Sequence, residues 1–311
     1  MNSYDVAVIG GGAAGLSAAL VLIRARRRVV VIDAGKPRNA PAAHMHGYLS
    51  RDGLPPADLL EIGRAEVASY DGQLITDSVT GITRHPDGTF EVLLAAKEPV
   101  LARRLLVATG LRDEVVDVPG VLERWGREVL HCPYCHGYEV RDQPIGVLGG
   151  NPEAVQHAQL VRQWSHDVVF FSHTTELTPE QREQLTARAI GIVDGAVARV
   201  VVEHDRLTGV ELADGRLVPR TAVFVRPSFV AGSTFLNDLG ATNDAQGWPM
   251  VDPSGRTTVP GVWAAGNAVN PRAQVITAAG EGSSAAIAIN NDLTDDDIRS
   301  AVDAFRAGLP A

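Results

Sequence analysis

The chain has little cysteine, few aromatic residues and no excess of positive charge. Only two of its 311 residues are cysteines, 5% are aromatic, and the formal net charge is −9. Two cysteines cannot build the disulfide framework of a small secreted protein. An acidic chain lacks the basic field that nucleic-acid binding needs, and no apolar run reaches the length of a membrane span. We therefore expect no nucleic-acid partner and no membrane partner.

The N-terminus also lacks a secretory signal, because Tyr4–Ile9 already reads as a strand. With one close cysteine pair and no export signal, the sequence favours a cytoplasmic redox protein. The chain is long enough for two domains with separate cores. Its 31 glycines suit an α/β protein with tight turns between strands and helices.

Both cysteines fall in one motif, His131-Cys132-Pro133-Tyr134-Cys135-His136. Two thiols separated by two residues near a helix start are typical of a redox couple, since helix N–H groups and a nearby imidazolium stabilise the thiolate. The two histidines provide a general acid or base on either side of the pair, and either one could carry the proton. The predicted catalytic residues are therefore Cys132, Cys135, His131 and His136.

Three other interpretations of this motif were weighed. A zinc site would need a second Cys/His pair at a suitable spacing, and none follows, so we predict no metal. A structural disulfide would close too short a loop to constrain much chain. Two inert core cysteines fit poorly with flanking histidines. The reversible dithiol–disulfide couple is the favoured interpretation.

The N-terminal region carries a dinucleotide-binding fingerprint. The apolar run Tyr4–Ile9 leads into G-x-G-x-x-G at Gly10, Gly12 and Gly15, and a second strand ends at Asp33. In this context the glycines allow a tight turn, close approach of a pyrophosphate and helix–strand packing, and the acid binds the ribose. Such a pyrophosphate lies on the helix N-terminus.

Several later segments have features of the same site or of its surroundings. Residues 36–56 read as a loop, containing His46, that either lies along a cofactor or is a solvated connection. Short strands over 73–82, 90–95 and 104–108 predict a small antiparallel excursion that ends at Ala108-Thr109-Gly110. A helix over 274–290 would present N–H groups near Gln274 and Val275 to a ring carbonyl. Thr294 with the three acids after it predicts the N-cap of a separate final helix.

A second strand–glycine–helix–strand unit spans residues 145–171, but its nucleotide chemistry is degraded. The motif reads Gly149-x-Asn151-x-x-Ala154, with Glu153 where phosphates would sit. Ser172–Thr175 offers no arginine for a 2′-phosphate. We expect NADPH binding here to be impaired, the alternative being that Asn151 adopts a permissive backbone and NADPH still binds.

Taken together, these motifs resemble those of the low-molecular-weight thioredoxin reductases, a family of two-domain flavoproteins. The resemblance covers nearly the whole chain: the opening fingerprint, Ala108–Gly110, the cysteine pair, the P-G-V-W-A-A-G run over 260–266, and Thr277–Gly280. It implies an α/β fold of two Rossmann-like, three-layer domains. The FAD-binding domain would be discontinuous, at 1–117 and 244–311, and the NAD(P)H-like domain with the redox pair would be inserted at 118–243.

The resemblance also implies roles for individual residues. Cys135 would lie against the flavin, Cys132 would react with the substrate, and the protein would be a homodimer. The implied FAD contacts are Gly10, Gly12, Ala13, Ala14, Gly15, Asp33, Ala34, Lys36, Arg38, Asn39, His46, Val79, Ala108, Thr109, Gly110, Gly266, Asn267, Gln274 and Val275.

Departures from the reductase pattern indicate the activity. His136 stands where reductases have an acid, the second nucleotide site is degraded, and Gly266-Asn267 replaces glycine–aspartate. A histidine-flanked C-P-x-C is similar to the dithiol oxidases that close disulfides in gliotoxin and holomycin. That similarity implies electron flow from a small-molecule dithiol through the cysteines and FAD to O2, giving H2O2. The alternatives are an NADPH-dependent reductase acting on a thioredoxin-like protein and a flavin-binding redox sensor without turnover.

Overall fold

The computed structural model describes residues 2–308 and divides them into two compact units. Unit 1 comprises residues 2–38, 57–112 and 231–308, and unit 2 comprises residues 39–56 and 113–230. The first division falls after residue 112 instead of 117, and the second after residue 230 instead of 243. Residues 39–56 group with unit 2. The α/β class with two Rossmann-like domains is confirmed.

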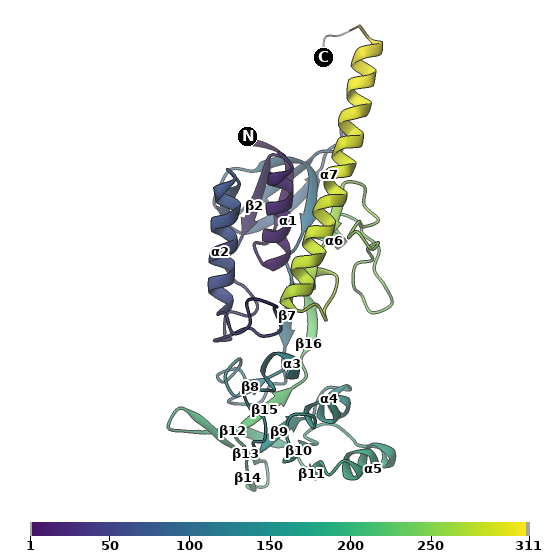
Figure 1. Cartoon of the computed structure of the whole chain (residues 1–311). Coiled ribbons are helices and arrows are strands. Elements are labelled where there is room, and N and C mark those ends of the chain that lie inside the picture. The colour runs from purple at the N-terminus through teal and green to yellow at the C-terminus, as the bar shows by residue number, and fades with distance from the viewer. Residues whose placement is uncertain (1, 309–311) are drawn as a thin grey trace. The chain divides into compact units, whose positions relative to one another are not determined.

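Unit 1 is built on a seven-stranded sheet (Figure 1). Its elements are β1 (Asn2–Ile9), α1 (Ala13–Arg24), β2 (Val29–Asp33), α2 (Pro56–Ser69), β3 (Gln73–Thr76), β4 (Val79–Arg84), β5 (Phe90–Leu94), β6 (Val100–Val107), α6 (Phe235–Asp238), β17 (Val262–Ala264), a 3-10 turn (Gly266–Ala268) and α7 (Val275–Arg306). The strand order is β3-β2-β1-β6-β5-β4, and β17 also pairs with β6. The expected antiparallel excursion is confirmed in β4, β5 and β6. The strand expected over 73–82 is instead two strands, because β3 joins β2 in the parallel sheet.

The core of unit 1 follows from strand alternation. Val6 and Val8 of β1 face one apolar cluster, which includes residues of α1, α2 and α7, while Ala7 and Ile9 face a second cluster on the opposite side of the sheet. Successive side chains of a strand point to opposite faces, so a continuous apolar run fills both cores. This burial fixes the register of β1, and with it the position of the glycine turn that follows.

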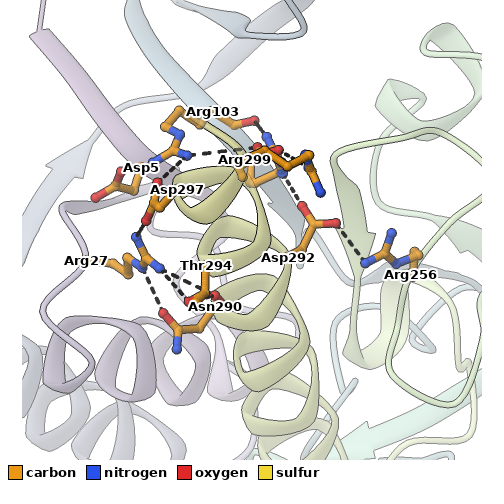
Figure 2. A network of polar contacts seen from close by, with 11 residues as sticks. Asp5, Arg27, Arg103, Arg256, Asn290, Asp292, Thr294, Asp297 and Arg299 are labelled. Atoms are coloured by element: carbon orange, nitrogen blue, oxygen red, sulfur yellow. Dashed lines mark hydrogen bonds and ion pairs between the residues drawn. The ribbon is translucent and has the colours of Figure 1, made fainter. Parts of the chain in front are cut away.

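Helix α7 is one continuous helix, and the expectation of a separate final helix capped at Thr294 is wrong. The Thr294 hydroxyl donates to the carbonyl of Asn290, one turn earlier, instead of capping a new helix. Figure 2 shows that the neighbouring acids pair with arginines outside α7: Asp297 with Arg27 and Arg103, and Asp292 with Arg256. Because tertiary ion pairs stabilise these acids in mid-helix, no break is required.

Unit 2 contains a five-stranded parallel sheet, β11-β10-β9-β15-β8, and a three-stranded antiparallel sheet, β12-β13-β14. Its elements are β8 (Val129–Leu130), α3 (Pro133–His136), β9 (Ile145–Leu148), α4 (Ala154–Val161), β10 (Val168–Phe171), α5 (Pro179–Ala187), β11 (Gly191–Val193), β12 (Val197–Glu203), β13 (Arg206–Leu212), β14 (Leu217–Pro219) and β15 (Ala222–Val225). Two further strands, β7 (Leu111–Glu114) and β16 (Ser228–Ala231), pair where the chain passes between the units.

The layers of unit 2 also follow from alternation along buried strands. Val168 and Phe170 join the cluster that holds residues of α4 and α5, whereas Val169 and Phe171 join the cluster beneath β12 and β13. Helices therefore cover one face of the parallel sheet and the small sheet covers the other. Within residues 2–308, no helix is both long enough and apolar enough to cross a membrane.

Candidate active site

The two cysteines form a disulfide at the start of α3. Their Cα atoms lie 5.2 Å apart, and the carbonyl of Cys132 accepts hydrogen bonds from the N–H groups of Cys135 and His136, both at 3.1 Å. Pro133 occupies the first helical position, where a missing N–H costs no hydrogen bond. Cys132 is 8% exposed and Cys135 is half-buried. A tight helical turn therefore holds both sulfurs in bonding geometry.

The two flanking histidines lie in different surroundings. The ring of His131 packs edge-on against Trp125 at 6.0 Å and against Phe229 at 5.9 Å, measured between ring centroids. Burial lowers the pKa of His136, while the charge of Glu139 opposes that shift. A lowered pKa keeps the His136 imidazole neutral near pH 7, in the form that accepts a proton.

No group of three or more His, Cys, Asp or Glu side chains in the described residues could hold a metal ion.

The first glycine turn has the geometry of a pyrophosphate cradle. A Cβ on Gly15 would lie 1.9 Å from the carbonyl oxygen of Gly10, and one on Gly10 would lie 2.4 Å from that of Ala108. Gly10 also has a φ of +106°, which side chains of L-residues rarely adopt. By contrast, a Cβ on Gly12 would meet no atom within 4 Å. The backbone is closed around Gly10 and Gly15 and open at Gly12.

The helix behind this turn leaves its first N–H groups directed at the open position. Gly12 is the N-cap of α1 and no side chain caps the helix. Ala13 and Ala14 form its first turn, and Asp33 at the end of β2 lies close to Gly11. The N-terminus of α1 is uncapped, and the space beside Gly12 is one that a Cβ would fill. This arrangement fits the pyrophosphate of FAD.

The other predicted FAD contacts in unit 1 are placed at the same end of its sheet or near it. Ala108, Thr109 and Gly110 follow β6, where the N–H of Gly232 donates to the carbonyl of Gly110 and the hydroxyls of Thr109 and Ser233 lie 2.9 Å apart. Ala34 and Lys36 follow β2 and are exposed. Val79 opens β4 and packs against the core.

Asn267 joins two of these segments. Its amide oxygen accepts a hydrogen bond from Arg38 at 3.3 Å, and its amide nitrogen donates to the carbonyls of Asn270 and Ala273. Gly266 donates its N–H to Glu281 of α7. Asn267 thus fixes the turn that ends at Gln274, the N-cap of α7, and Val275 begins that helix without a side-chain cap.

Two predicted contacts, Asn39 and His46, lie in the segment that groups with unit 2. Asn39 opens that segment, and its carbonyl accepts from Ala42. His46 lies between two carboxylates, those of Asp52 at 3.3 Å and Glu139 at 3.4 Å. Glu139 carried no recognisable motif in the sequence, so its contact with His46 is visible only in the structure.

The second glycine turn, at the start of α4, already uses its own hydrogen-bonding groups. Gly150 donates its N–H to Thr175, and the N–H of Glu153 donates to the side-chain oxygen of Asn151. Pro152 has no N–H, and Glu153 pairs with Arg226. The N–H groups of Gly150 and Glu153 are therefore already satisfied, and the Glu153 carboxylate is held by Arg226 at the start of α4. This arrangement does not fit the phosphates of NADPH.

Comparison with known proteins identifies the family. The family model of the pyridine nucleotide-disulphide oxidoreductases matches residues 4–282. Thioredoxin reductase sirT of Leptosphaeria maculans is 30% identical over 305 residues, with 92% of this chain and 93% of sirT covered. Thioredoxin reductase aclD of Aspergillus oryzae is 30% identical over 307 residues, with 94% of this chain and 98% of aclD covered. The protein in the crystal structure of HlmI is 55% identical in sequence to this chain, with a TM-score of 0.96. The match covers 98% of this chain and 97% of the HlmI chain.

The resemblance inferred from the motifs is therefore confirmed, and FAD is the cofactor of this group of enzymes. The chain belongs to the pyridine nucleotide-disulphide oxidoreductase family, as a thioredoxin reductase-like disulfide oxidoreductase.

Proposed function

We propose that this protein is a dithiol oxidase that forms a disulfide in a small-molecule dithiol and uses O2 as the electron acceptor. The observation that carries the proposal is the contrast between the two glycine turns. The turn at Gly12 is open for FAD, whereas the turn at Asn151 has satisfied its own donors and holds Glu153 against Arg226. An enzyme that does not take electrons from NADPH needs another donor, and the cysteine pair can accept them from a dithiol.

The chemistry of the cysteine pair begins with proton transfer. His136 accepts the proton of a substrate thiol, and the resulting thiolate attacks one sulfur of the Cys132–Cys135 disulfide. The protein S–S bond breaks as a mixed disulfide forms. The second substrate thiol then attacks the mixed disulfide, releasing the oxidised product and leaving both protein cysteines reduced. Two electrons and two protons have passed from substrate to protein.

FAD, which residues of unit 1 would hold, would supply two-electron redox chemistry between the reduced cysteine pair and O2, with H2O2 as the product. Lowering of the His136 pKa by burial supports its part in the first step, because the neutral imidazole accepts a proton near pH 7. His131, whose ring packs between Trp125 and Phe229, shapes the wall beside Cys132.

The experiment follows the yellow flavin band under anaerobic conditions, with NADPH in one cuvette and dithiothreitol in another, each then opened to air. The proposal expects bleaching by the dithiol alone, return of colour in air, and release of H2O2. Fast bleaching by NADPH would contradict it and favour the reductase, an activity consistent with the names of sirT and aclD. Absence of bleaching by both reagents would favour a redox sensor.

Two single variants test the cysteines themselves. The family resemblance assigns substrate attack to Cys132, although Cys135 is the more exposed of the two. Cys132→Ser and Cys135→Ser should each abolish turnover and keep bound FAD. Only the variant that retains the attacked cysteine should form a mixed disulfide with the oxidised substrate, because its thiolate attacks the substrate disulfide and the other substrate sulfur leaves as a thiolate. Full activity in either variant would refute the scheme.

A homodimer is part of the proposal. Helix α7 exposes apolar side chains along its length, including Ile287, Ile298 and Phe305, which is 83% exposed. Exposed apolar residues on one helix are typical of an interaction surface. Sedimentation of the holoenzyme measures the state directly, and a monomer at all concentrations would contradict this part.

A further inference from the structure

The segment from His44 to Leu54, called the His46 loop below, is folded by its own hydrogen bonds. Met45 donates its N–H to the carbonyl of Leu54 and accepts from Gly53, and its side chain is 5% exposed. The N–H of Gly47 donates to the carboxylate of Asp52 at 2.8 Å. A buried anchor and closed backbone bonds hold the loop in one shape, so its side chains have defined positions.

Inside this loop, His46 uses both ring nitrogens toward carboxylates. Nδ1 lies 3.3 Å from Oδ2 of Asp52, and Nε2 lies 3.4 Å from Oε1 of Glu139. The His46 side chain is 24% exposed, whereas Glu139 and Asp52 are 43% and 66% exposed. Each nitrogen of the His46 ring therefore faces a different carboxylate. His46 therefore ties the loop to the chain that follows the redox pair.

Glu139 in turn connects this contact with His136. It lies three residues after His136, and Gly137 between them has the right-handed helical conformation. Burial is the main cause that lowers the pKa of His136, the Glu139 carboxylate raises that pKa, and the His46 ring lowers it. The charged groups that act on His136 are thus Glu139, from its own segment, and His46, from the loop.

We propose that His46 is a positioning residue for the redox pair, held between Asp52 and Glu139 so that it sets the charge beside His136 and thereby governs proton transfer from the substrate thiol. The inference rests on the proposed function and deepens it at the same site. In the step concerned, the substrate S–H bond breaks, the proton moves to a ring nitrogen of His136, and the electron pair stays on sulfur. No further oxidant or reductant is needed.

The test measures how fast dithiothreitol reduces the Cys132–Cys135 disulfide in the anaerobic holoenzyme as a function of pH, by quenching in acid and alkylating the released thiols. Every variant uses the same dithiol, so its own titration cancels in the comparison. Because the His46 ring lowers the pKa of His136, removing that ring makes His136 harder to deprotonate. For His46→Gln we therefore expect the acidic limb of the profile to move to higher pH, with a rate about threefold lower on that limb.

Glu139→Gln should move the same limb in the opposite direction, to lower pH, because it removes a negative charge. His85→Gln is the matched control, since it removes another His–carboxylate contact, with Glu91 at 3.7 Å, in unit 1. Three outcomes would overturn the proposal: shifts in the same direction for His46→Gln and Glu139→Gln, no shift in either variant, or an equal shift in His85→Gln.

This assay separates the inference from the proposed function. Reduction of the disulfide by dithiothreitol needs neither O2 nor NADPH. If the wild-type flavin fails to reoxidise in air while the opposite pH shifts are found, the oxidase proposal fails and the role of His46 stands. If air reoxidation is normal and the shifts are absent, the oxidase stands and the role of His46 fails.

Discussion

Arg226 donates two hydrogen bonds to one carboxylate oxygen of Glu153, from Nε at 2.8 Å and from Nη2 at 2.5 Å. The guanidinium also lies over the ring of Phe229, with Cζ 5.0 Å from the centroid, and Phe229 packs against His131. The pair therefore holds the Glu153 carboxylate at the start of α4 and is connected through Phe229 to His131, the residue before Cys132. A residue that would repel a nucleotide has become part of the structure around the redox pair.

The double variant Asn151→Gly with Glu153→Ala should bind NADPH about tenfold more tightly than the wild type. The change removes a carboxylate, releases an N–H group and leaves the Arg226 cation for a phosphate, and tenfold corresponds to about 1.4 kcal/mol. Equilibrium titration with NADPH measures it. Glu180→Gln, which removes an acid from the first turn of α5, is the control and should change nothing. Tight NADPH binding by the wild type would contradict the argument.

Gly12→Ala should fold and lose FAD. Its Cβ meets no protein atom, but it occupies the opening in front of α1 where the pyrophosphate would approach. We expect FAD affinity to fall at least about tenfold, or about 1.4 kcal/mol, as measured by flavin fluorescence titration. Unfolding of the FAD-free protein should be unchanged. Gly15→Ala is the contrast, because its Cβ would overlap the Gly10 carbonyl and destabilise the FAD-free protein itself. Equal FAD affinity in Gly12→Ala and wild type would exclude this placement.

His157 should make the protein less stable in mild acid. It is buried on α4 against Phe224, and burial, with the charge of Arg226, lowers its pKa from 6.5 to about 4. Above pH 6.5 both folded and unfolded chains keep it neutral, so its contribution is intact. Between pH 6.5 and 4 only the unfolded chain takes the proton, and stability falls by up to about 3 kcal/mol.

The comparison that isolates this effect is His157→Leu. Denaturant unfolding of both proteins at pH 7 and pH 4.5 gives the free energies, and the variant should lose less stability on acidification than the wild type. Groups other than His157 titrate equally in both chains, so they cancel. An identical loss in the two proteins would show that His157 does not resist protonation.

Asp292→Ala should weaken the attachment of α7 to the sheet of unit 1. Asp292 accepts a hydrogen bond from Arg256 at 2.9 Å (Figure 2). It also accepts one from Arg104 at 2.6 Å, and Arg104 is only 13% exposed. Removing the acid leaves a largely buried cation with one partner fewer, at a cost of about 1–2 kcal/mol in free energy of unfolding. Asp303→Ala, at an exposed position further along α7, should cost almost nothing. Equal effects of the two changes in denaturant unfolding would disprove the prediction.

The cofactor turn and the redox motif could be identified from the sequence because each depends on neighbouring residues. The alternation that buries Val6 to Ile9 fixes β1, and the glycine spacing after it fixes the turn. Cys132 and Cys135 are close enough in the chain for one helical turn to join them. Local geometry was therefore sufficient to predict these two features from the sequence. The same motifs were sufficient to predict the fold class.

Only the tertiary structure decided the features that depend on distant residues. Thr294 and the acids after it have the local pattern of a helix start, yet α7 continues through them because arginines from other elements pair with those acids. Likewise, the loop around His46 groups with the unit that holds the cysteines, where it meets Glu139. Local propensities amount to a few tenths of a kcal/mol per residue, so contacts brought together by packing override them without leaving a pattern in the sequence.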